Sequence, residues 1–317
     1  MSVTLASLKH PMPAKGHMAD EIAKRVSAET TVRRDEPLAR RTTLRIGGPA
    51  DVYVEPASEA DLAAVVKFCS EHGVKFFTLG RGSNLLVRDN GFRGVVICLA
   101  HPVFSRIQFD GEHVRCGAGA KLKQVAVEAK QHGLSGLEFL EGIPGTVGGA
   151  LRMNAGAMGG ATFDAVEKIR IMDYFGSVQE LVPGLFRVEY RSCPLLKNHV
   201  ALGAVFKCRP APRETIEHQM NEFSRKRWDS QPAAPSAGCM FKNPPAVPAG
   251  KLIDELGLKG TRVGGAMVSA EHGNFIVNDG TATARDVLDL IELVKRCAKT
   301  RRGIELQTEV EIIGDEN

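Results

Sequence analysis

The chain has 317 residues, of which 43% are hydrophobic and 25% are charged, and this length predicts two or three domains. Its formal net charge of +4 is mild and its basic residues are dispersed, which excludes a nucleic-acid-binding footprint. No apolar run approaches membrane-spanning length, so no association with a membrane is expected.

The first two thirds of the chain are predicted to contain a lead-in followed by mixed strands and helices. Residues 1–40 form the lead-in, with one short helix at 18–28. Apolar residues at helical spacing predict a helix that begins with a capping box at Ser58 and ends at Gly73, and another at 122–129. Strands are predicted at 51–55, 75–79, 95–99, 107–109, 113–116, 166–172, 178–182 and 201–208.

The texture of the sequence changes at 209–213, where two prolines and two arginines predict a linker. The clearest helix beyond it begins with a capping box at Thr283 and Asp286 and ends at Gly303. The other predicted elements are helices at 216–228 and 252–256, a loop at 231–248, and strands at 275–278 and 309–313. This order is α+β rather than a strict βαβ alternation, so a doubly wound Rossmann sheet is not expected.

The most informative stretch is E-G-I-P-G-T-V-G-G-A-L-R-M-N-A-G-A-M at 141–158, which contains five glycines. Bare backbone N–H groups among small side chains suit an anionic ligand such as a pyrophosphate. A second turn of this kind, G-R-G-S-N, follows a predicted strand at 80–84. A tight structural turn would explain either one alone, but the density and the repetition favour two cofactor loops.

Several polar residues could carry chemistry, and the local sequence leaves their roles open. Arg191 in the loop Y-R-S could bind a carboxylate or be a solvated cation. Glu309 and Glu311 share one face of the last predicted strand, and nothing local separates them. Cys239 lies in a Pro-flanked loop and could be a nucleophile, an acid or a packing residue. His272 could be a base or a core residue.

The cysteines indicate the redox state of the cellular compartment in which the protein is expected. All seven lack a CxxC pair or a tight cluster, which indicates reduced thiols and gives no metal site. The first residues have no apolar signal core. A cytoplasmic protein is therefore expected.

The segments that carry the resemblance to a known family occur together and in order. They are T-T-L-R-I-G-G-P-A at 42–50, L-G-R-G-S-N-L-L-V at 79–87, the Gly-rich block at 136–157, Y-R-S at 190–192, Q-P and S-A-G-C-M-F-K-N-P within 231–244, V-G-G-A-M-V at 263–268 and E-V-E-I-I-G at 309–314. By these segments the chain resembles the bacterial UDP-N-acetylenolpyruvoylglucosamine reductases, the MurB flavoenzymes of peptidoglycan precursor synthesis. The first forty residues lie outside the resemblance.

The resemblance implies a fold and a reaction. The fold is an α+β, vanillyl-alcohol-oxidase-like (PCMH-type) FAD-binding domain of two subdomains at 41–210, with an α+β substrate domain at 211–317. In the reaction NADPH reduces non-covalently bound FAD, which then reduces UDP-N-acetyl-3-O-(1-carboxyvinyl)-glucosamine to UDP-N-acetylmuramate. The residues implied to hold FAD are Gly80, Arg81, Gly82, Ser83, Asn84 and Leu85 in the first loop, and Ile143, Pro144, Gly145, Thr146, Gly149, Ala150, Asn154, Gly156 and Ala157 in the second.

Matching positions also imply catalytic roles. Arg191 would bind the substrate carboxylate, and Glu309 rather than Glu311 would help to stabilise an enolate-like intermediate. Cys239 stands where many relatives have a serine proton donor, and a thiol of pKa ~8.5 is the stronger acid. The nucleotide sugar is expected to contact Tyr190, Arg225, Arg227, Lys242, Asn243 and His272. The chain resembles a compact subgroup without an extra substrate-covering loop, and a monomer or a weak oligomer is expected.

Two other functions are open. A FAD-dependent alcohol oxidase of the same superfamily would often carry a histidine for covalent flavin attachment near the first glycine loop, and R-G-S-N has none. A flavin- or nucleotide-binding regulatory protein without turnover would have no use for Arg191, Cys239 and Glu309 together. NADPH oxidation that depends on the enolpyruvyl sugar would distinguish the three.

Overall fold

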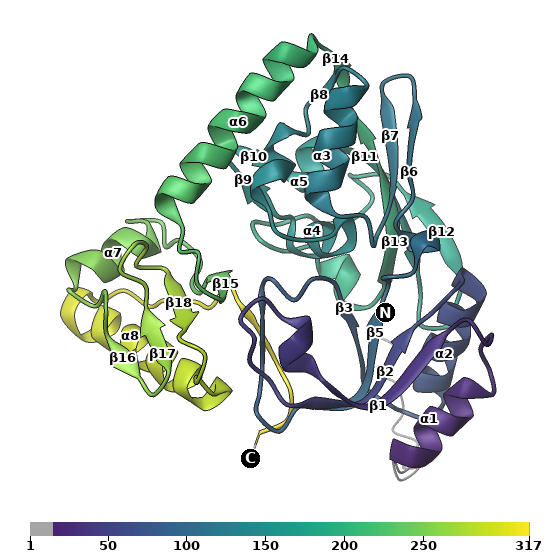
Figure 1. Ribbon diagram of the computed structural model, residues 1–317, viewed down its shortest axis with the longest axis horizontal. Coiled ribbons are helices and arrows are strands. Elements are labelled where there is room, and N and C mark those ends of the chain that lie inside the picture. The colour runs from purple at the N-terminus through teal and green to yellow at the C-terminus, as the bar shows by residue number, and fades with distance from the viewer. Residues whose placement is uncertain (1–14, 317) are drawn as a thin grey trace.

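The computed structural model describes residues 15–316, which form three packed bodies. Figure 1 shows two subdomains side by side and a C-terminal domain that the long helix α6 joins to the second of them. The first fourteen residues of the predicted lead-in lie outside the described residues. Among residues 15–316, no helix combines the length and the apolar character needed to cross a bilayer.

The first subdomain is a four-stranded mixed sheet in the order β1-β2-β5-β3. Alternation along β2 sends Val52 and Val54 toward a core shared with helices and sends Tyr53 to the opposite face. The elements are α1 (Lys15–Ala23), β1 (Thr31–Pro37), η1 (Leu38–Arg41), β2 (Pro49–Glu55), α2 (Glu59–Glu71), β3 (Phe76–Leu79), β4 (Leu85–Val87), β5 (Phe92–Cys98) and η2 (Pro102–Phe104). The Ser58 cap is present, because its side chain accepts the N–H of Asp61.

Much of the predicted lead-in belongs to this subdomain. The helix expected at 18–28 begins earlier, at Lys15, and ends at Ala23, and its Met18 and Ile22 are buried against the sheet. β1 pairs with β2 in antiparallel register from Thr31↔Glu55 to Pro37↔Pro49. These contacts attach residues 15–37 to the first sheet rather than leaving them as a separate lead-in. This edge strand was not predicted because the sequence of β1 is mostly charged and does not alternate between polar and apolar residues.

The second subdomain is a five-stranded antiparallel sheet in the order β12-β11-β13-β7-β6. Its elements are β6 (Ile107–Asp110), β7 (His113–Gly117), α3 (Leu122–Gln131), β8 (Leu134–Ser135), η3 (Glu138–Gly142), α4 (Val147–Met153), β9 (Gly156–Ala157), β10 (Gly160–Ala161), α5 (Thr162–Ala165), β11 (Val166–Met172), β12 (Val178–Leu181), η4 (Pro194–Lys197), β13 (Val200–Lys207), β14 (Arg209–Pro210) and α6 (Arg213–Ser230). The predicted linker at 209–213 is not free, because β14 pairs with β8 and α6 begins at Arg213.

The C-terminal domain packs α7 (Ala249–Glu255) and α8 (Ala284–Arg302) on the sheet β15-β18-β17-β16. The strands are β15 (Ser236–Cys239), β16 (Arg262–Val263), β17 (Ala266–Val268) and β18 (Phe275–Asn278). The capping box at Thr283 and the left-handed Gly303 bound α8 as predicted. β15 lies inside the stretch predicted to be loop.

One pairing joins the C-terminal domain to the first subdomain. β19 (Glu311–Ile313) runs parallel to β4, with Glu311 opposite Leu85. Leu44, Leu86 and Val310 are buried in the same apolar core as α8. The predicted strand at 309–313 therefore begins two residues later and closes the seam between the domains.

Candidate active site

The two glycine-rich loops lie against each other and form one wall. A Cβ at Gly80 would come within 2.9 Å of Oγ1 of Thr146, so the first loop approaches the second closely. The hydroxyl of Ser83 donates a hydrogen bond to the carbonyl oxygen of Pro144. The sequence predicted each loop separately, and the structure places them at a common site.

Gly82 allows the first loop to approach a third segment. Its φ of +60° is in the left-handed region, and a Cβ there would lie 2.5 Å from the carbonyl oxygen of Arg41. The N–H of Thr43 donates to the carbonyl oxygen of Gly82 at 3.2 Å, and its hydroxyl donates to that of Ser236 at 2.6 Å. Thr43 therefore links the loop to β15.

These loops border a cavity of about 950 Å³. It is lined by all the residues predicted to hold FAD except Asn154, namely Gly80, Arg81, Gly82, Ser83, Asn84, Leu85, Ile143, Pro144, Gly145, Thr146, Gly149, Ala150, Gly156 and Ala157. A second cavity of about 230 Å³ shares Gly80, Thr146 and Gly149 with it and extends toward Gly119. An elongated dinucleotide fits two adjoining cavities of this kind better than one round pocket.

Asn154 supports the site instead of lining it. It ends α4 with a φ of +39°, and its Nδ2 donates to the carbonyl oxygen of Glu189 at 3.1 Å. Its Oδ1 accepts the N–H of Phe163 at 3.2 Å. Nδ2 therefore holds the turn that carries Arg191, and Oδ1 holds the start of α5.

Arg191 occupies a tight turn in which Glu189 and Ser192 exchange backbone hydrogen bonds. Its φ of +57° is rare for a residue with a long side chain, and such outliers occur at functional sites. The Nη1 atom donates to the carbonyl oxygen of Gly156 at 3.0 Å. Nε lies 2.9 Å from Oε1 of Glu309 as an ion pair, but its N–H is not aligned for a hydrogen bond to any acceptor.

Glu309 is fixed by its backbone. Its N–H donates to the carbonyl oxygen of Met240 at 2.8 Å, and its carbonyl oxygen accepts from Nδ2 of Asn84 at 3.1 Å. The side chain is 13% exposed, and burial raises the pKa of its carboxyl above the usual range. The positive charges of Arg191 and Lys242 oppose this rise in pKa.

Cys239 ends β15 and lines the same cavity. Burial raises the pKa of its thiol to about 12, the negative charge of Glu309 adds to the rise, and Arg191 and the side chain of Asn274 oppose it. The thiol is therefore protonated at neutral pH. The site therefore brings together a protonated thiol, a guanidinium and a carboxylate from three distant parts of the chain.

A second ion pair in the cavity was not predicted. Arg152 donates to both carboxylate oxygens of Glu311, at 2.5 and 3.2 Å, and to the carbonyl oxygen of Leu196 at 2.7 Å. Its guanidinium lies 5.8 Å from the centre of the Phe77 ring. The sequence held a signal, because Arg152 is the only basic residue in the Gly-rich block at 141–158.

The residues predicted to contact the substrate are only partly brought together. Arg227 lines the cavity, and the Tyr190 ring lies 5.4 Å from the guanidinium of Arg191. Lys242 is near enough to act on the pKa of Glu309. The other three residues do not line the cavity. Arg225 is exposed on α6, and the side chain of Asn243 accepts the N–H of Ala249. His272 packs beside Gly250 and Phe275.

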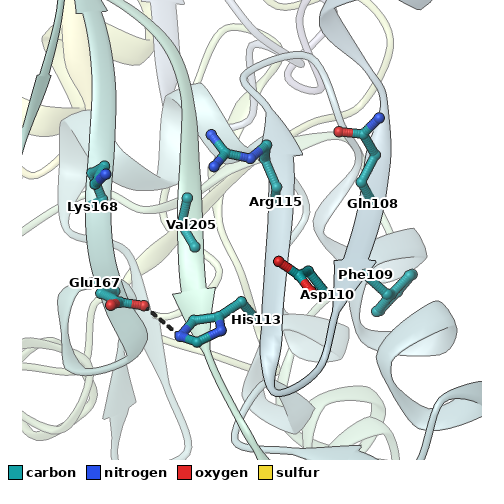
Figure 2. Close-up of a pocket in the computed structure, with 8 residues that line it drawn as sticks. All are labelled: Gln108, Phe109, Asp110, His113, Arg115, Glu167, Lys168 and Val205. Carbon is teal, nitrogen blue, oxygen red and sulfur yellow. Dashed lines mark ion pairs between the residues drawn. The ribbon is translucent and has the colours of Figure 1, made fainter.

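A separate hollow of about 710 Å³ lies on the face of the five-stranded sheet. Figure 2 shows its side chains rising from β6, β7, β11 and β13, with the ion pair between His113 and Glu167 at 2.8 Å. Its lining is charged, both partners of this pair are more than 40% exposed, and it shares no residue with the larger cavity. It is the solvent face of the sheet, and the glycine loops do not reach it.

Comparison with known proteins agrees with this geometry. A family model described as FAD binding domain matches residues 50–181. A second, described as UDP-N-acetylenolpyruvoylglucosamine reductase, C-terminal domain, matches residues 231–313. Together they cover both glycine loops of the cavity wall, and the C-terminal domain with Cys239 and Glu309. Fold and site thus define a FAD-binding flavoprotein oxidoreductase with a C-terminal substrate domain, as expected from the sequence.

Whole-chain relatives give the family. The UDP-N-acetylenolpyruvoylglucosamine reductase of Geobacter metallireducens is 45% identical, over 94% of this chain and 100% of its own length. That of Bacillus subtilis is 44% identical, over 88% and 93%. The crystal structure of the Thermus caldophilus enzyme (MurB) has a TM-score of 0.77 at 39% identity, covering 90% of this chain and 98% of its own. The chain belongs to the UDP-N-acetylenolpyruvoylglucosamine reductase family.

Proposed function

We propose that Arg191, Cys239 and Glu309 are the catalytic residues of the family's reaction in this chain. The enzyme is a flavin-dependent oxidoreductase that reduces enolpyruvyl UDP-N-acetylglucosamine to UDP-N-acetylmuramate, with FAD as cofactor and NADPH as co-substrate, in peptidoglycan precursor synthesis. The observation that carries the assignment of residues is the meeting of a protonated thiol, a guanidinium and a buried carboxylate at one cavity lined by both glycine loops.

The residues present fit FAD. Gly80 and Gly82 leave no room for a side chain where the first loop packs on Thr146 and Arg41, and glycine-rich backbone of this kind suits a pyrophosphate. The loop residues that line the cavity would hold the cofactor, while Asn154 would support it indirectly. When bound, FAD supplies the hydride that NADPH provides.

Arg191 is proposed to bind the substrate carboxylate. A guanidinium can donate two parallel hydrogen bonds to a carboxylate, and the Nε–H of Arg191 has no aligned acceptor within residues 15–316. When a hydride adds to the β-carbon, that carbon becomes a methyl group and the electron pair of the double bond moves toward the carboxylate. Arg191 would stabilise the charge that develops there.

Glu309 is proposed to position Arg191 and to support the same intermediate. Its charge attracts the guanidinium, whose Nε lies 2.9 Å from Oε1, and its raised pKa makes a protonated, hydrogen-bond-donating form accessible. A carboxylate that stayed charged beside the developing enolate would oppose it. Glu309 is therefore expected to hold a proton when the intermediate forms.

Cys239 is proposed to complete the reduction by giving its proton to the α-carbon. The thiol S–H bond breaks as the α-carbon–hydrogen bond forms, and the thiolate regains a proton from solvent. The raised pKa keeps the donor protonated, and the positive charge of Arg191 stabilises the thiolate that remains.

Tyr190 and Arg227 are proposed to contact the nucleotide sugar, with Lys242 acting through its charge on Glu309. The other three residues, Asn243, Arg225 and His272, would then act indirectly. They would stabilise the structure of the C-terminal domain or contribute to the electrostatic field around it. A monomer or a weak oligomer in the cytoplasm is proposed, with a domain boundary near residue 210. The seven free cysteines, of which Cys69, Cys116, Cys193 and Cys208 are buried, support a reducing compartment.

The decisive experiment separates the two half-reactions of the enzyme. In the variant Cys239→Ala, NADPH should still bleach the bound flavin, whereas reoxidation by the enolpyruvyl sugar should slow by about two to four orders of magnitude. Cys239→Ser should restore much of the activity. The buried Cys69→Ala is a control, because that thiol lies in the first subdomain core. Near wild-type reoxidation in Cys239→Ala would refute the assignment.

A further inference from the structure

The chain has a single tryptophan, and it is exposed at the cavity. Trp228 lies in the last turn of α6 and its side chain is 68% exposed. Within the described residues its indole makes no ring–ring or cation–ring contact. An indole usually buries most of its surface, so an unpartnered one that lines a ligand cavity indicates contact with a ligand.

The neighbours of Trp228 hold it at the mouth of the cavity. Nη1 of Arg227 donates to the carbonyl oxygen of Gly142 at 2.7 Å, which attaches the helix end to the start of the second glycine loop. The N–H of Gln231 donates to the carbonyl oxygen of Arg227 at 2.9 Å and closes the helix. Figure 1 shows α6 passing from the second subdomain to the C-terminal domain. The indole is thus carried by the element that joins the two walls of the cavity.

The lining of the cavity carries more positive than negative side chains. Its lining includes seven arginines, Arg40, Arg41, Arg45, Arg81, Arg152, Arg191 and Arg227, against two carboxylates, Glu309 and Glu311. Such an excess of guanidinium groups suits diphosphates. The reacting end of the substrate must lie beside Cys239 and Glu309, which are largely buried. Its diphosphate and the base beyond it then extend toward the exposed rim, where Trp228 lies.

We propose that Trp228 stacks on the uracil base of the nucleotide-sugar substrate and thereby sets its affinity. A base presents a flat π-face to an indole, and stacking of this kind is worth about 1–3 kcal/mol per base on alanine substitution. The inference rests on the proposed function, because it takes the reacting end of the substrate to lie at Cys239.

Steady-state kinetics of the FAD-loaded enzyme test the role. Trp228→Ala should raise the KM for the enolpyruvyl sugar about tenfold or more while leaving kcat within about twofold. Trp228→Phe should recover much of the loss. Phe175→Ala is the matched control, because Phe175 is also 68% exposed but lies in the turn between β11 and β12, outside the cavity. An unchanged KM for the sugar, or a raised KM for NADPH alone, would overturn the proposal.

Fluorescence gives a readout independent of turnover, since Trp228 is the only tryptophan. UDP titrated into the FAD-loaded wild-type protein should change the tryptophan emission saturably, and the dissociation constant should rise about tenfold in Trp228→Ala when measured by calorimetry. Uridine should compete and ribose 5-phosphate should not. UDP binding that leaves the emission unchanged would contradict stacking.

The two proposals fail in different ways. If the wild-type enzyme reduced the sugar but Trp228→Ala behaved like Phe175→Ala, only the stacking role would fall. If Cys239→Ala reduced the sugar normally, the catalytic assignment would fall, while the UDP titration of Trp228 would still measure whether the ring contacts the base.

Discussion

The carboxylate of Glu309 lies 2.9 Å from Nε of Arg191, and the two groups shift the pKa of the Cys239 thiol in opposite directions. Glu309 raises the pKa of the thiol through its negative charge, and Arg191 lowers it. The acidity of the proposed donor is therefore set by the balance between two partners that also contact each other. A substitution of either partner should therefore change the pKa of the Cys239 thiol by a measurable amount.

Glu309→Gln should make Cys239 more acidic and the enzyme less active. The amide keeps the shape of the side chain but removes the charge that disfavours the thiolate, so the pKa of Cys239 should fall. Alkylation of Cys239 by iodoacetamide at pH 8.5, followed by mass spectrometry, should be faster than in wild type, while turnover falls about 10²–10³-fold. Glu311→Gln is the control, because that carboxylate pairs with Arg152. Equal alkylation rates in both variants would contradict the coupling.

Ionisation of the Cys239 thiol should not slow the substrate half-reaction between pH 7 and pH 10. The pKa of Cys239 is raised by burial to about 12, so the thiol keeps its proton as pH rises and loses it only as pH passes through that value. An ordinary thiol would be half ionised near pH ~8.5. Stopped-flow reoxidation of reduced flavin by the sugar should therefore show no loss between pH 7 and pH 10 that Cys239→Ser removes. A fall near pH 8.5 in wild type that is absent from Cys239→Ser would show that the thiol is not shielded in this way.

Gly82→Ala should weaken FAD binding more than its backbone strain alone explains. The new Cβ would meet the carbonyl oxygen of Arg41 at 2.5 Å, and the φ of +60° adds a cost of about 1–3 kcal/mol. Gly111→Ala is a matched control, since Gly111 has a φ of +57° and no atom within 4 Å of an added Cβ. Flavin content after purification and thermal unfolding measure the difference. Similar flavin content in the two variants would remove Gly82 from the cofactor wall.

Arg152 and Glu311 should stabilise the junction between the second subdomain and β19 as a pair. Both side chains are 30% exposed, and the contact is bidentate, so a coupling above the usual surface value of about 1 kcal/mol is expected. Urea unfolding of Arg152→Met, Glu311→Gln and the double variant forms the cycle. Additive losses of unfolding free energy would mean that the two residues act independently.

Local patterns in the sequence predicted the elements whose ends are set by local chemistry. α8 begins and ends where its capping box and Gly303 place it, and β11 and β18 match the predicted 166–172 and 275–278. Both glycine loops were found by their density of glycine, and the structure leaves no room for a Cβ at positions such as Gly82 and Gly156. Alternation correctly placed Glu309 and Glu311 on one face, and both line the cavity.

Features that depend on tertiary contacts were missed. β15 has a left-handed Gly238 and a register shift against β18, so its residues do not alternate as a strand should. Asn154 resembles a ligand-binding residue in its loop, but its amide is used by Glu189 and Phe163. His272 lacks any local sign that it faces α7 rather than the cavity. The environment of each of these residues depends on which distant segment packs against it. A local sequence pattern does not contain that information.

The parallel pairing of β19 with β4 has a consequence for biosynthesis. The ribosome makes both glycine loops, Arg191 and Cys239 long before it makes Glu309 and the strand that follows. A nascent chain could fold its two subdomains and begin to bind flavin, yet its reaction centre would lack a carboxylate until β19 had left the exit tunnel. Catalytic competence is therefore delayed to a late stage of translation, whatever the order in which the rest of the molecule folds.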